Sequence, residues 1–167
     1  VHFFWGSFDL AITRFSGRRA PPRNDPDPVL RKIMQEAYSH EVISAGWWPG
    51  GGEIQEAAFY CYAAPAPAGF AQGEVLPAEA FYHSGMGEYL LMYDAVRQAR
   101  SPSAMLLDFL QSTYDAGADL AKWDKQDAQS IRAMRRLVDE FPNDPNAPSL
   151  AYVLSNVFRG HNDELAS

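Results

Sequence analysis

The pattern of the chain changes at residues 101–120, which read Ser-Pro-Ser-Ala-Met-Leu-Leu-Asp-Phe-Leu-Gln-Ser-Thr-Tyr-Asp-Ala-Gly-Ala-Asp-Leu. Ser101 is a suitable N-cap, and Pro102 stands at the first helical position, where its missing N–H is not needed. Apolar or small side chains then recur at steps of three or four residues: Leu106, Phe109, Leu110, Thr113, Gly117 and Leu120. This spacing predicts a long amphipathic helix over residues 103–122.

Upstream of this helix the sequence is typical of short strands. Residues 2–15 alternate between two faces, and further runs follow at residues 37–44, 58–63, 81–83 and 88–93. Gly and Pro separate the runs, and no intervening segment is a convincing crossover helix. We therefore expect an α+β fold, with a mostly antiparallel sheet of four or five strands and the 103–122 helix against one sheet face.

Other segments complete the expected organisation. Residues 16–28 contain four prolines and predict an exposed loop, and residues 29–36 could form two helical turns. Two further C-terminal helices are expected over residues 127–141 and 149–159. We predict an α+β domain over residues 1–125 and a helical C-terminal extension over residues 126–167. Because the chain opens directly in a strand-like sequence, we expect a longer protein whose N-terminal half is the partner of this part.

The composition excludes several classes of protein. Fourteen Lys and Arg against 21 Asp and Glu give a net charge of −7, which opposes general binding to nucleic acid or an anionic membrane. A single Cys excludes an intramolecular disulfide framework and a Cys-rich zinc site. The sequence has no apolar run of membrane-spanning length and no signal peptide. We expect a soluble, cytoplasmic, aromatic-rich protein.

Several uncommon aromatic strings occur in the order and spacing of one family. They are residues 2–11 (HFFWGSFDLA), 13–18 (TRFSGR), 38–41 (YSHE), 48–50 (WPG), 59–62 (FYCY), 87–91 (GEYLL), 93–97 (YDAVR) and 109–114 (FLQSTY). Over roughly residues 1–125 the chain resembles the C-terminal half of the bacterial domain-of-unknown-function family 5996. The resemblance implies no reaction, substrate or cofactor, because none is established for this family.

The first candidate site residues are His40 and Glu41, together with His2 and His83. Imidazole and carboxylate groups can bind a divalent metal or perform acid–base chemistry near neutral pH. Adjacent residues on a strand point to opposite faces, so a regular strand brings only one of His40 and Glu41 to a site. No metal-ligand spacing is present. We expect His40 to be a hydrogen-bonded sheet histidine, with a catalytic role as the alternative, and we predict no metal and no cofactor.

The second set of candidates alternates along the first strand: Trp5, Ser7, Asp9 and Thr13. Apolar walls with a few polar groups suit a small-molecule pocket, although a sheet face covered by other elements has the same pattern. Trp48 begins a Pro-Gly-Gly-Gly loop that could close over a pocket or return its aromatic ring to the sheet. We interpret the basic cluster of Arg14, Arg18, Arg19 and Arg23 mainly as a solvated loop. We interpret Cys61 as an inert buried thiol.

Two functions remain open. The first is a structural or interaction module of a longer protein. The alternative is an aromatic-lined small-molecule binding or non-metal enzymatic domain that uses Asp9 and His40. In that alternative Glu41 is a further catalytic candidate, and the ligand-binding candidates are Trp5, Tyr38, Trp48 and His2. An enclosed cavity reached by Asp9 and His40 favours the alternative, whereas a solid core with an exposed apolar patch near residues 1–8 favours the interaction module.

Overall fold

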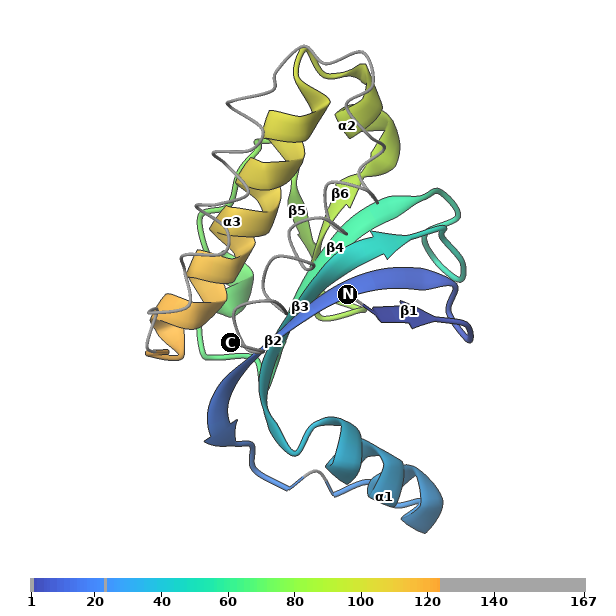
Figure 1. The fold of residues 1–167 in the computed structure, drawn as a ribbon, viewed down its shortest axis with the longest axis vertical. Helices are drawn as coiled ribbons and strands as arrows, with labels where there is room; N and C mark the ends of the chain where they lie inside the picture. The colour runs from blue at the N-terminus through green and yellow to red at the C-terminus, as the bar shows by residue number, and fades with distance from the viewer. Residues whose placement is uncertain (1, 23, 124–167) are drawn as a thin grey trace, which may run out of the picture.

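The computed structural model describes residues 2–22 and 24–123. The elements are β1 (His2–Phe4), β2 (Asp9–Arg19), α1 (Pro28–Ala37), β3 (His40–Trp48), β4 (Ala58–Ala64), the 3-10 helix η1 (Phe70–Gln72), β5 (Phe81–His83), β6 (Glu88–Met92), α2 (Tyr93–Gln98) and α3 (Pro102–Leu120). The strands form one antiparallel sheet in the order β1-β2-β3-β4-β6-β5. Figure 1 shows α3 lying across one face of this sheet, while α1 extends away from it.

The α+β class and the antiparallel pairing are confirmed, but the described sheet has six strands instead of four or five. The extra strand arises within residues 2–15, where the chain turns back at residues 5–8. Phe8 adopts a positive φ of 56° in this turn, and Phe4 then pairs with Asp9. One expected strand therefore becomes the hairpin β1–β2. Strand β2 also continues to Arg19, inside the expected loop, because Arg19 pairs with His40 after a register shift.

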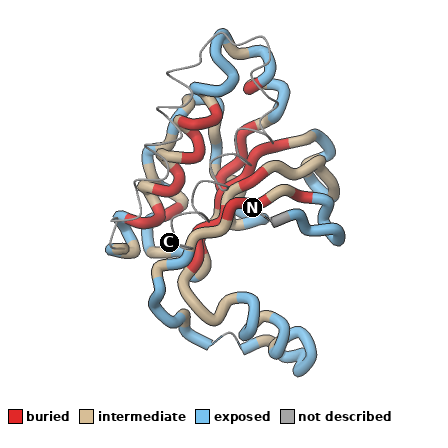
Figure 2. Tube along the Cα trace, viewed as in Figure 1, coloured by how far each residue is buried: buried red, intermediate tan, exposed pale blue. Residues whose placement is uncertain are grey.

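Helix α1 lies outside the core. Its start at Pro28 is fixed by Asp27, whose carboxylate accepts hydrogen bonds from the backbone N–H groups of Val29 (2.8 Å) and Leu30 (3.2 Å). No residue of α1 is buried, and its apolar Val29 and Ile33 are 68% and 55% exposed. Figure 2 shows α1 as an exposed or partly exposed tube throughout. The helix agrees with the predicted two turns, whereas α2 was not expected from the sequence.

The main hydrophobic core lies between α3 and the sheet face that it covers. Its largest members come from the three strands β3, β4 and β6 and from η1, α2 and α3: Ile43, Phe59, Cys61, Phe70, Tyr89, Leu91, Val96, Leu106, Phe109 and Tyr114. The predicted stripe of α3 is buried except for Leu120, which is 44% exposed at the end of the helix. Leu107, Tyr114 and Ala118 are buried as well, so the buried face of α3 is wider than the predicted stripe.

Several predictions lie beyond the part of the chain that the structure describes. The helices expected over residues 127–141 and 149–159 fall outside the described residues, as does the extension expected over residues 126–167. The division of the chain into these two domains stays a prediction. Within residues 2–22 and 24–123, no helix combines the length and the apolar character needed to cross a membrane.

Candidate ligand-binding cleft

The sheet face opposite α3 carries an open cleft of about 740 Å³. Successive strand residues point to opposite faces of a sheet, and residues of five strands meet in this cleft. The strand residues that line it are Phe4 of β1, Asp9, Thr13 and Phe15 of β2, Val42, Ser44 and Trp48 of β3, Tyr60 and Tyr62 of β4, and Glu88 of β6. The turn residues Ser7 and Met86 and the end of α1 at Ala37 and Tyr38 complete the wall.

Asp9 and Tyr60 form the buried polar centre of the cleft. Asp9 is 7% exposed, and its Oδ2 accepts a hydrogen bond of 2.5 Å from the Tyr60 hydroxyl. Its Oδ1 accepts a second hydrogen bond from the Ser7 hydroxyl. Burial and the hydrogen bond to Asp9 both raise the pKa of Tyr60, so this phenol remains a donor at physiological pH.

Gly46 makes room for this contact. Gly46 pairs with Ala11 of β2 on one side and with Tyr60 of β4 on the other. A Cβ atom at position 46 would lie 2.9 Å from the Tyr60 hydroxyl oxygen and 2.1 Å from the carbonyl oxygen of Leu10. The absence of a side chain at Gly46 therefore lets the phenol of Tyr60 lie over β3 and reach Asp9.

Glu88 supplies a second carboxyl group to the cleft. It is half-buried at the first position of β6. Burial, and to a smaller extent the negative charge of Asp9, raise the pKa of Glu88 from 4.5 to about 7. Within the described residues, no hydrogen bond or ion pair reaches its carboxylate. Glu88 can therefore exchange a proton near neutral pH, and it can receive a hydrogen-bond donor or a positive charge.

Hydroxyl groups and aromatic rings surround the two carboxyl groups. The rings of Tyr60 and Tyr62 stack at a centroid distance of 6.2 Å and an interplanar angle of 14°. The hydroxyl oxygens of Tyr62 and Tyr38 lie 3.4 Å apart. The hydroxyl groups of Thr13 and Ser44 lie 3.0 Å apart between β2 and β3. The cleft thus has aromatic walls with a few polar groups, the usual composition of a small-molecule site.

Several predicted site residues meet in this cleft. Asp9 and the accompanying Ser7 and Thr13 line it, as do the ligand-binding candidates Tyr38 and Trp48. Trp5 does not line it, because the turn between β1 and β2 leaves its side chain 81% exposed. The side chain of His2 lies outside the described part of the chain.

The structure does not bring Asp9 and His40 together. His40 pairs with Arg19, whereas Leu10, the neighbour of Asp9, pairs with Trp47 near the other end of β3. Eight residues of strand therefore separate His40 from the Asp9 end of the cleft, a length of roughly 25 Å. His40 Nδ1 instead lies 3.1 Å from the Ser39 hydroxyl. This placement agrees with the expected hydrogen-bonded sheet histidine.

Glu41 faces the opposite side of the sheet from the cleft. Its Oε2 accepts hydrogen bonds from Trp123 Nε1 at 2.9 Å and from the Ser16 hydroxyl at 3.0 Å. The Arg18 guanidinium approaches the same oxygen to 2.7 Å and also donates to the carbonyl oxygen of Ala121 at 2.6 Å. Glu41 therefore joins β2, β3 and the end of α3, which is a structural arrangement.

His83 is likewise engaged outside the cleft. Its Nδ1 accepts a hydrogen bond from the backbone N–H of Met86, and its Nε2 lies 3.5 Å from a carboxylate oxygen of Glu53. His83 is on the edge strand β5, three strands away from His40 on β3. Across residues 2–22 and 24–123, no three His, Cys, Asp or Glu side chains gather as a metal ion requires.

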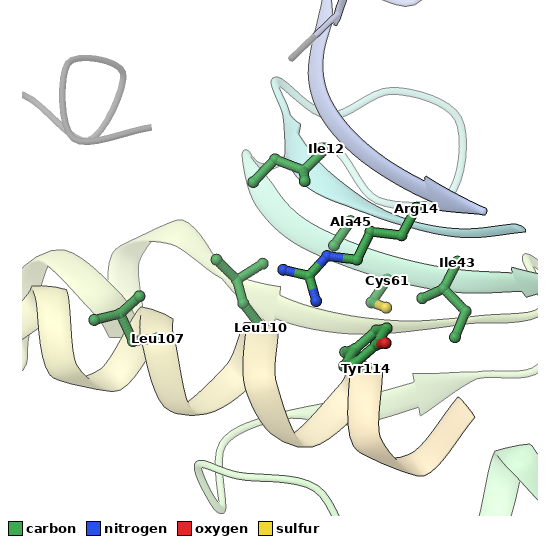
Figure 3. Close-up of a pocket in the computed structure, with 8 residues that line it drawn as sticks. All are labelled: Ile12, Arg14, Ile43, Ala45, Cys61, Leu107, Leu110 and Tyr114. Atoms are coloured by element: carbon green, nitrogen blue, oxygen red, sulfur yellow. The ribbon is translucent and has the colours of Figure 1, made fainter. Parts of the chain in front are cut away.

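A much smaller cavity of about 20 Å³ lies in the core between the sheet and α3, with room for about one water molecule. Figure 3 shows Arg14 extending toward Tyr114 between apolar side chains, and its Cζ lies 4.4 Å from the ring centroid. Arg14 Nη1 is buried without a hydrogen-bond partner among the described residues. The expectation that Arg14 belongs to a solvated basic loop is therefore wrong. Burial raises the pKa of Cys61, beside it, to about 12, which agrees with the predicted inert thiol.

Four polar residues of the cleft were not predicted from the sequence: Ser44, Tyr60, Tyr62 and Glu88. Their positions carried a signal, since Tyr60 and Tyr62 stand two residues apart on one strand and therefore share a face. Glu88 is the single charged residue in the otherwise apolar β6. Their convergence depends on β4 pairing with both β3 and β6, which the sequence pattern alone does not specify.

The fold is that of an α+β domain with an aromatic, acidic cleft on one face of an antiparallel sheet. The model of the Family of unknown function (DUF5996) matches residues 1–130, and the chain belongs to this family. Membership of the family that the aromatic strings resemble is thus confirmed, and the match extends slightly beyond residue 125. The match does not show that the chain is the C-terminal half of a family member. Comparisons with curated proteins and with solved structures gave no match.

Proposed function

We propose that the cleft opposite α3 binds a small organic molecule. The observation that carries this proposal is the convergence of Asp9, Tyr60 and Glu88 in an aromatic-lined cleft of about 740 Å³. This volume falls in the range of about 300–1,000 Å³ that is typical of small-molecule sites.

The polar chemistry supports binding more strongly than volume alone. A partly buried carboxylate without a hydrogen-bond partner costs free energy, and such groups are concentrated at functional sites. Glu88 is this kind of group within the described residues, and Asp9 adds a second negative charge beside it. Tyr60 holds the Asp9 carboxylate in place from the opposite side of β3.

A second candidate, a non-metal enzymatic function, is supported by Glu88. A general acid or base works best when its pKa lies near the working pH, and the pKa of Glu88 is raised to about 7. Asp9 stands beside it as a carboxylate with fixed hydrogen-bond donors. In this enzymatic alternative, the general acid or base is Glu88 and not His40, the candidate that the sequence suggested.

A third candidate is the interaction module, and exposed aromatic side chains support it. Phe3, Trp5 and Phe8 cluster on the β1–β2 hairpin with ring centroids 5.0 Å and 5.1 Å apart, and all three are exposed. We propose as their partner the N-terminal half of a longer bacterial, cytoplasmic protein, of which this chain would be the C-terminal half. Reduced hydrogen exchange of this hairpin in the longer protein supports that arrangement, and unchanged exchange contradicts it.

Ligand-observed NMR with a library of water-soluble metabolites and fragments tests the proposed binding function. Met86 lines the cleft and is exposed, so Met86→Trp narrows the cleft without altering the core. Leu76→Trp is the matched control, since Leu76 is also exposed but lies outside the cleft. We expect compounds whose signals are lost with Met86→Trp and retained with Leu76→Trp. A library without such compounds contradicts the proposal.

A further inference from the structure

We propose that the ligand of the cleft is a small organic ammonium compound, bound with its charged nitrogen at Glu88 and its apolar part against the aromatic rings. This inference rests on the proposed binding function and deepens it by naming the class of ligand. Charge, hydrogen-bonding capacity and aromatic content of the cleft each support it.

The charge of the cleft selects for a cation. Asp9 and Glu88 both line it, whereas none of the described residues that line it is a Lys, Arg or His. The two carboxyl groups interact electrostatically, since the charge of Asp9 contributes to the raised pKa of Glu88. An anionic ligand would add a third negative charge to this group, while a cation would relieve the repulsion between the first two.

The hydrogen bonds of the cleft leave Glu88 as the acceptor for the ligand. Both oxygens of the Asp9 carboxylate are engaged, one with the Tyr60 hydroxyl and one with the Ser7 hydroxyl. Among the described residues, Glu88 has no such donor. An ammonium N–H group can supply the missing charge-assisted hydrogen bond, which is stronger than a neutral one.

The aromatic rings fit the same class of ligand. Tyr60 and Tyr62 stack beside Glu88 on the neighbouring strand, and Trp48 lines the cleft at the end of β3. Aromatic rings attract cations through their negative faces and also bind the apolar body of an organic ligand. A bare metal ion uses neither property, so the walls favour an organic cation.

The surroundings of Glu88 hold no competing positive charge among the described residues. Asp9, Tyr60 and Tyr62 are the titratable groups that face it. His83 pairs with Glu88 across β5 and β6, but its imidazole contacts the Met86 N–H and Glu53. An ammonium ligand at Glu88 lowers the pKa of this carboxyl group, so ligand affinity rises as the pH increases from about 6 to about 8.

Three compounds of nearly equal shape test the inference: 2-phenylethylammonium, 2-phenylethanol and 3-phenylpropanoate. They share a phenyl ring and a two-carbon chain but carry a positive, a neutral and a negative group. Binding is measured at neutral pH by the chemical shifts of the tyrosine rings and by calorimetry. We expect the ammonium compound to bind at least about tenfold more tightly than the alcohol, since removing a charge-assisted hydrogen bond commonly costs that much.

Variants of the chain assign the preference to Glu88. Glu88→Gln keeps the shape of the side chain but removes the charge, so we expect it to abolish the preference for the ammonium compound. Glu79→Gln, at an exposed position outside the cleft, should leave the preference unchanged.

The outcomes separate this inference from the binding function on which it rests. If the alcohol or the carboxylate binds the cleft as tightly as the ammonium compound, the ligand class is wrong and the binding function stands. A preference that survives Glu88→Gln, or no binding of the ammonium compound at millimolar concentration, also overturns the inference. The binding function itself fails only if the library yields no compound whose binding depends on Met86.

Discussion

The phenolic hydroxyl of Tyr60 donates a hydrogen bond of 2.5 Å to Asp9, a residue 51 positions earlier in the chain and two strands away in the sheet. The contact passes over Gly46 of β3, which has no side chain to obstruct it. It fixes the carboxylate of Asp9, a buried residue that lines the cleft. The same hydrogen bond therefore joins β2 to β4 and positions a carboxylate in the cleft.

The first prediction concerns this hydrogen bond. Tyr60→Phe leaves a carboxylate oxygen of Asp9 buried without its donor, which costs about 1–3 kcal/mol of the free energy of unfolding. Urea denaturation of Tyr60→Phe, Asp9→Asn and the double variant measures the loss and the coupling of the two residues. We expect a double variant less destabilised than the sum of the single variants, and strictly additive losses would show that the contact contributes nothing.

The second prediction concerns Gly46. Gly46→Ala places a Cβ atom 2.1 Å from the carbonyl oxygen of Leu10. Because both groups are fixed to the backbone, β2 and β3 must move apart to relieve this clash. We expect a loss of at least about 2–3 kcal/mol in the free energy of unfolding, larger than that of most single substitutions. Gly6→Ala is the matched control, since an added Cβ atom there meets no atom within 4 Å. Equal stability of the two variants would contradict the close approach of β2 and β3.

The third prediction concerns the pH dependence of stability. The pKa of Glu88 is about 7 in the folded chain and takes its ordinary value of 4.5 when unfolded. The folded state therefore binds more protons between these values, so Glu88 lowers the stability as the pH rises from about 4.5 to about 7. Above about pH 7 this loss of stability is complete. It amounts to about 1–2 kcal/mol of the free energy of unfolding, because the partial exposure of Glu88 to solvent reduces the effect of its raised pKa.

Glu88→Gln tests this dependence because the amide cannot ionise. We expect the variant to be more stable than the original chain by about 1–2 kcal/mol at about pH 8 and similar to it at about pH 4.5. Urea denaturation across this range gives the difference, with Glu79→Gln as the exposed control. A difference independent of pH would show that Glu88 titrates normally in the folded chain.

The fourth prediction concerns Glu41, which we interpret as a structural residue. Glu41→Gln weakens the interactions that its carboxylate makes with Arg18, Ser16 and Trp123. We expect a loss of about 1–3 kcal/mol in thermal or urea unfolding, with ligand binding at the cleft unchanged. The exposed pair of Asp94 and Arg97 offers a comparison, since Asp94→Asn should have no measurable effect on stability. A loss of binding with intact stability would instead make Glu41 a site residue.

The sequence predicted the fold class because its periodicities are strong. The three-and-four spacing around Leu106, Phe109 and Leu110 requires a buried helix face, and the short runs between Gly and Pro require antiparallel strands. The sixth strand was missed because alternation continues through residues 5–8, so the pattern of residues 2–15 does not reveal the turn. The turn depends on the positive φ of Phe8, which aromatic residues seldom adopt.

The cleft could be predicted only in part, because it depends on which strands are neighbours. Asp9, Tyr38 and Trp48 were recognised from their chemistry and alternation, and the structure places them on one face. Glu88 was missed because its importance arises from its position beside Asp9, which depends on the pairing of β6 with β4. His40 was a candidate because its imidazole can perform acid–base chemistry. The register of β2 and β3 nevertheless places it at the opposite end of β3 from Asp9.

Crystals of the chain soaked with the compounds that bind in the library screen would locate the ligand directly. We expect electron density in the cleft, with a donor group of the ligand within hydrogen-bonding distance of Glu88 and its apolar part against Tyr60, Tyr62 or Trp48. Density for bound compounds only elsewhere on the surface, with this cleft filled by solvent, would contradict the proposed function.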